Sequence, residues 1–329
     1  MKLNEIGFPA ITEERASTVS SASNLSRCEL IVTNRCNLAC KYCKKNYLTL
    51  TDVSKELGHK IIAGWVENNV SFVNFSGGEP LYNLNLPDFV DHLAQSGVPF
   101  ISLSTNGTLP VNDYFKLINL GVTHLAISID GMNAESFDKM VGDIPGTWKD
   151  VVYNIKQLSP LVYVTASTVF NKDNYNEADE IIKFIDSLGV ADIRFSTATQ
   201  VSSLIPKLEA IPDYIMEKHP LLKYRVNRLK NGQNMRGAAT SKKCWLPLDD
   251  IVATSEYHYP CSMQLRELGV SIGKILDSNG NVKPIEKIRQ ERANWINNFD
   301  CRNNKICQKY CMDFIIAYNN RVSEIRCVK

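Results

Sequence analysis

Six short apolar runs, rich in β-branched residues, recur along the chain. The first five are each followed by a stretch with helical periodicity. Alternation of strands and helices requires parallel strands joined by right-handed crossovers. The pattern therefore predicts an α/β protein, built either as an open doubly wound sheet or as a partial barrel. The strands are expected at residues 28–33, 71–76, 99–104, 123–129, 162–169 and 192–197.

Side chains that favour helix ends add detail to this pattern. Asn112 is expected to cap a helix that ends at Gly121. Asn174 and Glu177 have the spacing of a capping box, which would begin a helix that ends at Gly189. These positions predict one helix after the third strand and another after the fifth.

The alternation of strands and helices defines the domain organisation. Residues 1–27 are polar, and we expect them to form an irregular N-terminal arm. The strand–helix pattern assigns residues 28–240 to one large domain. In residues 241–329 the apolar runs are short, so we expect a small domain in which cysteines replace a hydrophobic core.

The composition is that of an ordinary globular protein, with 44% hydrophobic and 22% charged residues. The formal net charge of +2 gives no reason to expect binding to nucleic acid or to an anionic membrane. The sequence contains neither an apolar run long enough to span a bilayer nor a signal-peptide pattern. We therefore expect a cytoplasmic protein without a membrane or nucleic-acid partner.

The distribution of the ten cysteines is unusual. Nine of them fall in two groups, at residues 36–43 and 244–327, and residues 44–243 contain none. A reducing cytoplasm disfavours structural disulfides, so clustered thiols there indicate a metal site. The remaining one, Cys28, lies in the first predicted strand and is expected to be a small buried hydrophobic residue.

The first cysteine group follows directly on the first predicted strand, in the segment TNRCNLACKYC at residues 33–43. Its cysteines therefore lie in a loop at the carboxyl end of a strand, where α/β folds place their chemistry. Three thiolates within eight residues suit a soft metal centre. On a four-iron cluster, Cys36, Cys40 and Cys43 would leave one iron without a protein ligand, free to bind a substrate or cofactor.

A zinc site, or free thiols near a turn, are the alternatives for this loop. Zinc requires a fourth Cys or His ligand. The nearest histidine in the sequence, His59, lies in a predicted helix. The residues of the loop leave these alternatives open.

The CxxxCxxC spacing, with the aromatic Tyr42 before the last cysteine, resembles the motif of radical S-adenosylmethionine (SAM) enzymes. In that family the amino and carboxylate groups of the methionine part of SAM chelate the open iron of a [4Fe-4S] cluster. Reductive cleavage of SAM then gives a 5′-deoxyadenosyl radical, which abstracts a hydrogen from the substrate. The resemblance implies a partial (β/α)6 TIM-like barrel, which selects between the two architectures above.

Further segments resemble motifs of this family in the expected order. SGGEP, after the second strand, is similar to a GGEP motif in which glycines allow close approach of the backbone and Glu79 accepts a hydrogen bond from the cofactor's ammonium group. STNG and SIDG, at the ends of the third and fourth strands, resemble polar segments that contact the cofactor. The resemblance implies cofactor-binding roles for Tyr42, Gly77, Gly78, Glu79, Ser104, Asn106, Ser128, Asp130 and Ser167.

The second cysteine group resembles the C-terminal SPASM and Twitch extensions of this family, which hold auxiliary iron–sulfur clusters. The SPASM core, CxxCxxxxxCxxxC, lacks its first cysteine here, where Asn298 occupies the position. The resemblance implies metal-binding roles for Cys244, Cys261, Cys301, Cys307, Cys311 and Cys327.

Six thiols are too few to ligate two four-iron clusters fully. The family's pairing would assign Cys244, Cys261 and Cys311 to one cluster and the other three cysteines to a second. If only one cluster forms, Cys244, Cys261 and members of the group at 301–311 are the favoured ligands. A zinc ribbon is the alternative for this region.

The resemblance implies an oxidoreductase or peptide-modifying enzyme that abstracts hydrogen from a C–H bond. We expect maturation of a ribosomally synthesised peptide by crosslinking, epimerisation or oxidation, because the late cysteines exceed what a minimal Twitch protein needs. The alternative is a dehydrogenase or decarboxylase of a sugar, nucleoside or other small molecule in natural-product biosynthesis. The expected partners are the peptide or small-molecule substrate and an electron donor such as flavodoxin or ferredoxin. A zinc-binding structural or interaction protein is the alternative from another class.

Overall fold

The computed structural model describes residue 3 and residues 11–44, 51–197 and 205–328. The chain forms two compact units, and each is assembled from separate stretches of sequence. Unit 1 contains residues 1–35, 44–101 and 236–329, and unit 2 contains residues 36–43 and 102–235. The domain limits expected from the sequence, at 27/28 and 240/241, stay a prediction.

Unit 1 contains five adjacent strands of the main sheet, in the order β10-β9-β8-β1-β2. Strand β1 pairs in parallel with both β2 and β8, and β9 runs antiparallel to its two neighbours. The strands are β1 (Arg27–Thr33), β2 (Phe72–Gly77), β8 (Asp250–Ala253), β9 (Tyr257–Tyr259) and β10 (Gly273–Lys274). A separate antiparallel pair is formed by β7 (Arg236–Gly237) and β11 (Cys311–Met312).

Unit 2 contains parallel strands in the order β3-β4-β5-β6. They are β3 (Phe100–Thr105, of which residues 102–105 belong to this unit), β4 (His124–Ser128), β5 (Tyr163–Phe170) and β6 (Asp192–Thr197). Each predicted strand is confirmed to within one residue at both ends, and so is the predicted α/β fold class. The continuation of the unit 1 sheet through β8 was not predicted from the sequence.

The helices of unit 1 are α1 (Glu13–Thr18), α2 (Lys55–Glu67), α3 (Leu86–Gln95), α11 (Ser262–Arg266), α12 (Ile285–Asn298), α13 (Lys305–Tyr310) and α14 (Asp313–Val328). Those of unit 2 are α4 (Val111–Leu120), α5 (Ala134–Met140), α6 (Thr147–Leu158), α7 (Ala178–Ser187), α8 (Ile205–Glu209), α9 (Asp213–Lys218) and α10 (Pro220–Lys230). Single 3₁₀ turns lie at Pro80–Tyr82, Tyr175–Glu177, Leu246–Leu248 and Cys301–Asn303. None of the helices that the structure describes is long and apolar enough to cross a bilayer.

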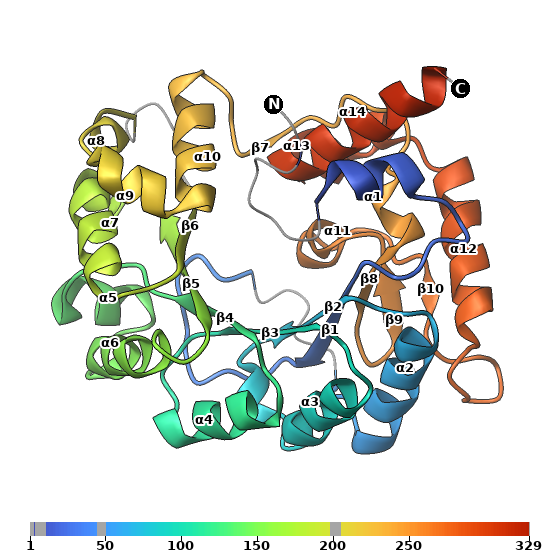
Figure 1. Cartoon of the computed structure of the whole chain (residues 1–329), viewed down its shortest axis with the longest axis horizontal. Coiled ribbons are helices and arrows are strands. Elements are labelled where there is room, and N and C mark those ends of the chain that lie inside the picture. The colour runs from blue at the N-terminus through green and yellow to red at the C-terminus, as the bar shows by residue number, and fades with distance from the viewer. Residues whose placement is uncertain (1–2, 4–10, 45–50, 198–204, 329) are drawn as a thin grey trace. The chain divides into compact units, whose positions relative to one another are not determined.

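The strands of unit 2 have one apolar face and one polar face. In β5, Val164, Ala166 and Phe170 are fully buried, whereas Thr165 and Ser167, which alternate with them, are only partly buried. Helices α4, α6 and α7 follow the outer side of these strands (Figure 1), and α7 and α10 contact β6. Burial of the apolar face against helices leaves the other face, with its hydroxyl groups, as the surface where a ligand can bind.

The N-terminal arm is not irregular throughout, which corrects the prediction for residues 1–27. Helix α1 begins after Thr12, whose hydroxyl oxygen accepts a hydrogen bond from the Arg15 backbone N–H at 3.1 Å. The helix contacts α14. Arg15 forms a bidentate ion pair with Asp249, with N···O distances of 2.6 and 2.8 Å. This ion pair attaches the arm to the start of β8.

The two predicted helix caps are also wrong, although the predicted helix ends are right. Asn112 lies inside α4, which begins after Pro110. The side chain of Asn174 does not cap a helix; its amide donates instead to the backbone carbonyl oxygens of Asp130 and Val169, at 2.8 and 3.1 Å. Gly121 and Gly189 end their helices with φ values of +127° and +81°, in the left-handed region that glycine adopts easily.

We predict that Arg15→Met lowers the free energy of unfolding by about 3–5 kcal/mol, because it leaves the Asp249 carboxylate buried without its cation. The side chains of Arg15 and Asp249 are only 7% and 3% exposed. Urea denaturation would measure the loss. Glu14→Ala, at an exposed position of the same helix, serves as the control and should change stability little. Equal effects of the two substitutions would contradict this role for the ion pair.

Candidate functional site

Three thiols of the first cysteine group lie on one loop of unit 2, at residues 36–43. The loop is fixed to the C-terminal end of α5 by two backbone hydrogen bonds, Ala39 N–H to Val141 O at 2.9 Å and Lys41 N–H to Met140 O at 3.2 Å. None of these three cysteines forms a disulfide; Cys36 and Cys43 are exposed, and Cys40 is partly buried. The loop therefore presents a group of soft ligands from a fixed backbone.

Asn106, at the end of β3, contacts this loop. Its amide nitrogen donates to Asn37 Oδ1 at 2.8 Å and lies 3.8 Å from Cys36 Sγ. The Leu38 backbone N–H donates to the same sulfur at 3.4 Å. Hydrogen-bond donors around a sulfur stabilise its thiolate form, which is the form that binds metal.

The electrostatics of the loop favour a positively charged ligand. Burial, together with the nearby Asp130, Cys43 and Cys36, raises the pKa of the Cys40 thiol to about 12. Such a thiol ionises only if a cation compensates the charge. The donor set of this loop thus fits an iron–sulfur cluster, whose irons would supply that compensation.

Tyr42 and Asp130 interact directly. The Tyr42 hydroxyl donates to Asp130 Oδ2, and the Val169 backbone N–H donates to Asp130 Oδ1 at 2.6 Å. Burial raises the pKa of Asp130 to about 6, although both hydrogen bonds lower it. Burial likewise raises the pKa of Tyr42, so its hydroxyl keeps its proton and acts as the donor. The pair connects the cysteine loop to the segment after β4.

Hydroxyl groups and one guanidinium lie in register across three strands. Ser128 on β4 pairs with Ser167 on β5, which pairs with Arg194 on β6. The Arg194 Nη2 donates to Ser167 Oγ at 2.9 Å. Ser104 on β3 pairs with Ala126, two residues before Ser128 on the same face. Paired residues on parallel strands point to the same side, so these side chains share the polar face of the sheet.

The sequence analysis did not single out Arg194. Among the residues of the four strands β3, β4, β5 and β6, Arg194 is the one lysine or arginine. The signal that could have identified it is the alternation of polar Asp192, Arg194 and Ser196 with apolar residues in the sixth predicted strand. A guanidinium on a polar face among hydroxyl groups suits a carboxylate or phosphate ligand.

The SGGEP segment lies in unit 1, where it packs against the chain after β1. A Cβ added to Gly77, which has φ of +148°, would lie 2.1 Å from Thr33 O. A Cβ on Gly78 would lie 2.2 Å from Arg35 O. The backbone N–H of Glu79 donates to Arg35 O at 2.7 Å, and the Glu79 side chain is fully buried. Both glycines are therefore required by this close approach of two backbone segments.

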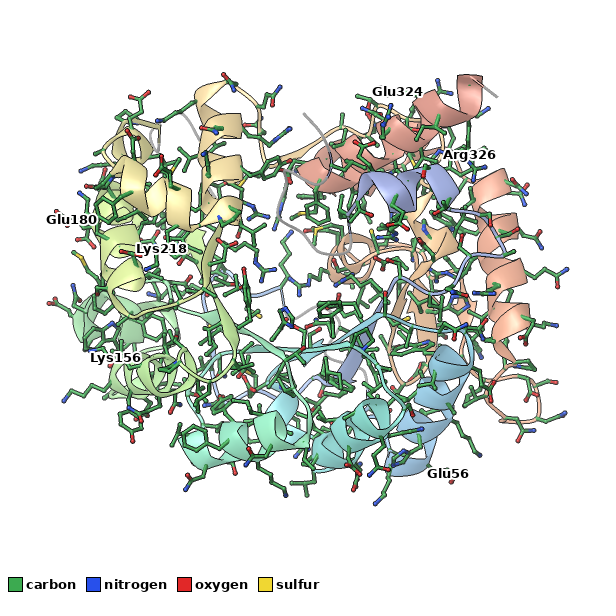
Figure 2. The ribbon with its side chains drawn as sticks, in the orientation of Figure 1. Glu56, Lys156, Glu180, Lys218, Glu324 and Arg326 are labelled. Atoms are coloured by element: carbon green, nitrogen blue, oxygen red, sulfur yellow. The ribbon has the colours of Figure 1, made fainter. Side chains whose placement is uncertain are left out.

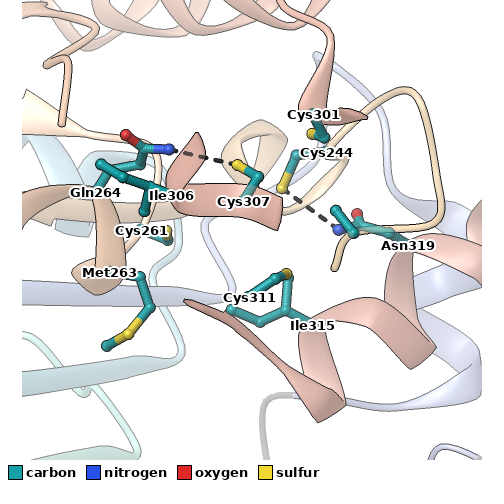
Figure 3. A pocket seen from close by; sticks show the side chains of 11 residues that line it. Cys244, Cys261, Met263, Gln264, Cys301, Ile306, Cys307, Cys311, Ile315 and Asn319 are labelled. Carbon is teal, nitrogen blue, oxygen red and sulfur yellow. Dashed lines mark hydrogen bonds between the residues drawn. The ribbon is translucent and has the colours of Figure 1, made fainter. Parts of the chain in front are cut away.

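Five of the six late cysteines line one pocket of unit 1 (Figure 3), namely Cys244, Cys261, Cys301, Cys307 and Cys311. They come from segments that are distant in sequence. The sixth, Cys327, is exposed near the end of α14. Glu324 and Arg326 are exposed residues of the same helix (Figure 2), and the Arg326 guanidinium lies 4.0 Å above the ring of Trp245.

The sulfurs in this pocket influence one another's ionisation. Burial, together with the neighbouring Cys244, raises the pKa of Cys261 to about 12. Burial also raises the pKa of Cys311, together with Cys244, Cys261 and Cys307. Hydrogen bonding by the Cys301 thiol lowers the pKa of Cys244 and of Cys307. Closely spaced thiols in an apolar pocket fit a multinuclear iron–sulfur cluster. Among the described side chains, no group of three or more His, Cys, Asp or Glu is arranged to hold a single metal ion.

Comparison with known proteins identifies relatives of the part of the chain that contains the first cysteine group. Residues 30–185 match the model of the Radical SAM superfamily. A probable GTP 3′,8-cyclase of Methanosarcina acetivorans is 29% identical over 203 residues, which cover 57% of this chain and 60% of the relative. An AdoMet-dependent heme synthase of Oleidesulfovibrio alaskensis is 30% identical over 172 residues, covering 50% of this chain and 44% of the relative.

Solved structures share the fold at low sequence identity. A structure described as native anSMEcpe with bound AdoMet and Kp18Cys peptide has a TM-score of 0.60 and 15% identity, covering 92% of this chain and 97% of that one. SuiB of Streptococcus suis, bound to its precursor peptide SuiA, has a TM-score of 0.55 and 12% identity, covering 83% and 64%. The likeness shows the fold. The chain spans 60% or less of the length of the curated relatives described above.

We predict that Tyr42→Phe lowers the free energy of unfolding by roughly 1–3 kcal/mol, because it leaves one oxygen of the buried Asp130 without its donor. Asp130 is 1% exposed. Chemical denaturation of the metal-free protein would measure the change. Tyr153→Phe removes the hydroxyl of an exposed tyrosine on α6 and is the matched control. A loss of the same size in both variants would mean that the contact to Asp130 adds nothing.

Proposed function

We propose that this chain is a radical SAM enzyme that cleaves SAM reductively, because residues 30–185 match the model of the Radical SAM superfamily. The observation that carries the proposal is the loop of three reduced cysteines, Cys36, Cys40 and Cys43, within the matched region. These thiols would hold a [4Fe-4S] cluster with one iron open to SAM. The bound cluster would supply the electron that generates the 5′-deoxyadenosyl radical.

The protein's own contribution is to fix and shield the reactants. Tyr42, Asp130 and Asn106 hold the cysteine loop in place. We propose that the hydroxyls of Ser104, Ser128 and Ser167 bind the ribose and carboxylate of SAM, with Arg194 compensating the negative charge. For Gly77, Gly78 and Glu79 the family resemblance supports a role at the SAM ammonium group.

We propose that the cysteine pocket of unit 1 holds one auxiliary four-iron cluster of the SPASM or Twitch kind. The five cysteines that line it exceed the four ligands that one cluster needs. Cys327 is exposed and does not line this pocket, so it is not needed as a ligand. This arrangement is the single-cluster alternative, and a zinc-loaded pocket would contradict it.

The substrate that we propose is a peptide, from which the enzyme abstracts a hydrogen during crosslinking, epimerisation or oxidation. In support, a fold neighbour that matches nearly the whole of this chain holds a peptide together with AdoMet. A small molecule is the second candidate, favoured by the sequence relatives whose names specify a GTP cyclase and a heme synthase. Transfer of deuterium from a labelled substrate into 5′-deoxyadenosine would distinguish the two.

The proposed reaction requires an external one-electron donor, because amino-acid side chains do not supply electrons continuously. We propose flavodoxin or ferredoxin, and a cytoplasmic location where thiols stay reduced and available to iron. Anaerobically purified protein should be brown, with about eight irons and matching sulfide per chain. Colourless, zinc-loaded protein would refute the proposal in favour of a structural or binding role.

We predict that Cys40→Ala abolishes 5′-deoxyadenosine formation, because two remaining thiols cannot hold the first cluster. Liquid chromatography after reduction with dithionite in the presence of SAM measures the product. Cys28→Ala, at a buried cysteine outside both groups, should retain the activity. Substantial product from the Cys40 variant would refute this assignment of the cluster.

We predict that Cys307→Ala lowers the iron content below eight, by up to about four irons, because Cys307 is proposed as one of the ligands of this cluster. It should still form some 5′-deoxyadenosine but lose substrate modification. Cys327→Ser should keep the full iron content, since this residue lies outside the pocket. Iron and sulfide assays on both variants check these outcomes. Loss of iron from the Cys327 variant, or none from the Cys307 variant, would contradict the single-cluster assignment.

A further inference from the structure

Two buried carboxamides point at sulfurs in the cysteine pocket of unit 1 (Figure 3). The amide nitrogen of Asn319, on α14, donates to Cys244 Sγ at 3.4 Å. The amide nitrogen of Gln264, on α11, donates to Cys307 Sγ at 3.4 Å. Asn319 is 4% exposed and Gln264 is 2% exposed. Both amides are therefore removed from water, where a hydrogen bond to sulfur carries more weight.

The orientation of the Asn319 amide is fixed by its other end. Asn319 Oδ1 accepts a hydrogen bond from the Trp245 backbone N–H at 2.7 Å. Since a backbone N–H requires an acceptor, the oxygen must face Trp245 and the nitrogen must face Cys244. The contact to Cys244 is thus an N–H donor directed at sulfur.

The orientation of Gln264 follows from a helix cap. Asn304 Oδ1 accepts from the backbone N–H groups of Ile306 and Cys307, at 3.1 and 3.0 Å, at the start of α13. This oxygen is therefore an acceptor, and the group that meets it at 3.0 Å must be the Gln264 nitrogen. The same nitrogen reaches Cys307 Sγ.

The position of Gln264 depends on Gly269. A Cβ at residue 269 would lie 1.9 Å from Gln264 Oε1, so a side chain there would displace the amide. Gln264 Oε1 itself is buried without a hydrogen-bond partner within the described part of the chain. Burying an amide oxygen without a hydrogen-bond donor costs folding free energy. We therefore infer that the contacts of the Gln264 N–H groups with Asn304 and Cys307 offset this cost or serve the function of the pocket.

We propose that Asn319 and Gln264 are positioning residues that raise the reduction potential of the auxiliary cluster, and that Cys244 and Cys307 are two of its ligands; this rests on the auxiliary cluster of the proposed function. When an external donor adds one electron to the cluster, negative charge increases on its sulfurs. An N–H group directed at a ligand sulfur stabilises that charge, so the reduced state gains more than the oxidised state. The two amides contact different sulfurs, Cys244 and Cys307, and should contribute separately.

The test uses the full chain with Cys36, Cys40 and Cys43 changed to Ala, so that the auxiliary cluster alone gives a signal. Asn319→Asp keeps the oxygen that accepts from Trp245 N–H and replaces the donor to Cys244. Gln264→Met removes the second donor without adding charge. An EPR-monitored redox titration should give a more negative potential in each variant. We expect about a tenfold change in the reduction equilibrium, which is about 59 mV for one electron.

Gln308→Met is the matched control. The Gln308 amide donates to the backbone carbonyl oxygens of Ala239 and Cys301, at 3.0 and 3.2 Å, and its loss should leave the potential unchanged. An equal shift in this control would overturn the proposal, and so would unchanged potentials in Asn319→Asp and Gln264→Met. If the parent protein contains no auxiliary cluster, the proposed function of the pocket fails instead, which iron analysis reveals first.

A second measurement does not depend on the variants. In the unmutated protein, exchange into D₂O places deuterium on both amides. Electron–nuclear double resonance of the reduced auxiliary cluster should then show deuteron couplings from exchangeable N–D groups close to ligand sulfur. Absence of such couplings would overturn the proposal even if the variants fail to retain iron.

Discussion

The hydrogen bond from Tyr42 to the buried Asp130 ties the first cysteine loop to the sheet of unit 2. The loop at residues 36–43 has no helix or strand of its own. Its position depends on this contact, on the backbone hydrogen bonds to Met140 and Val141, and on the amide of Asn106. The Asp130 carboxylate also accepts a hydrogen bond from the Val169 N–H in β5. The loop is therefore connected through Asp130 to the parallel strands, which restrict its motion.

In both cysteine groups, some of the thiols must lose a proton before they can bind a metal. Cys40 and Cys261, which are partly withdrawn from water and close to other thiols, resist ionisation, as their raised pKa values indicate. Metal-bound sulfur is a thiolate, so a cluster bound at either group would have to compensate this charge. In the first group the protein adds donors around Cys36; in the second it adds the amides of Asn319 and Gln264.

The sequence was sufficient for features that arise from local patterns. Strand positions followed from alternating hydrophobicity, and the cysteine loop followed from its spacing after a strand. Features set by distant contacts were not accessible. Asn174 has the sequence of a cap, but its amide is used by two carbonyl groups near β4 and β5. Strand β8 has four residues, and its burial comes from pairing with β1, more than 200 positions earlier in the sequence. The contact of Asn319 with Cys244 spans 75 positions, so no local motif could predict it.

The central claim is that the cluster of the first loop binds SAM directly through an open iron. The most direct measurement is electron–nuclear double resonance of the reduced protein with SAM that carries ¹⁷O in its carboxylate. The account predicts an ¹⁷O hyperfine coupling to the cluster, absent from the Cys40→Ala protein. An iron-loaded, reduced protein that binds SAM without any such coupling would contradict it.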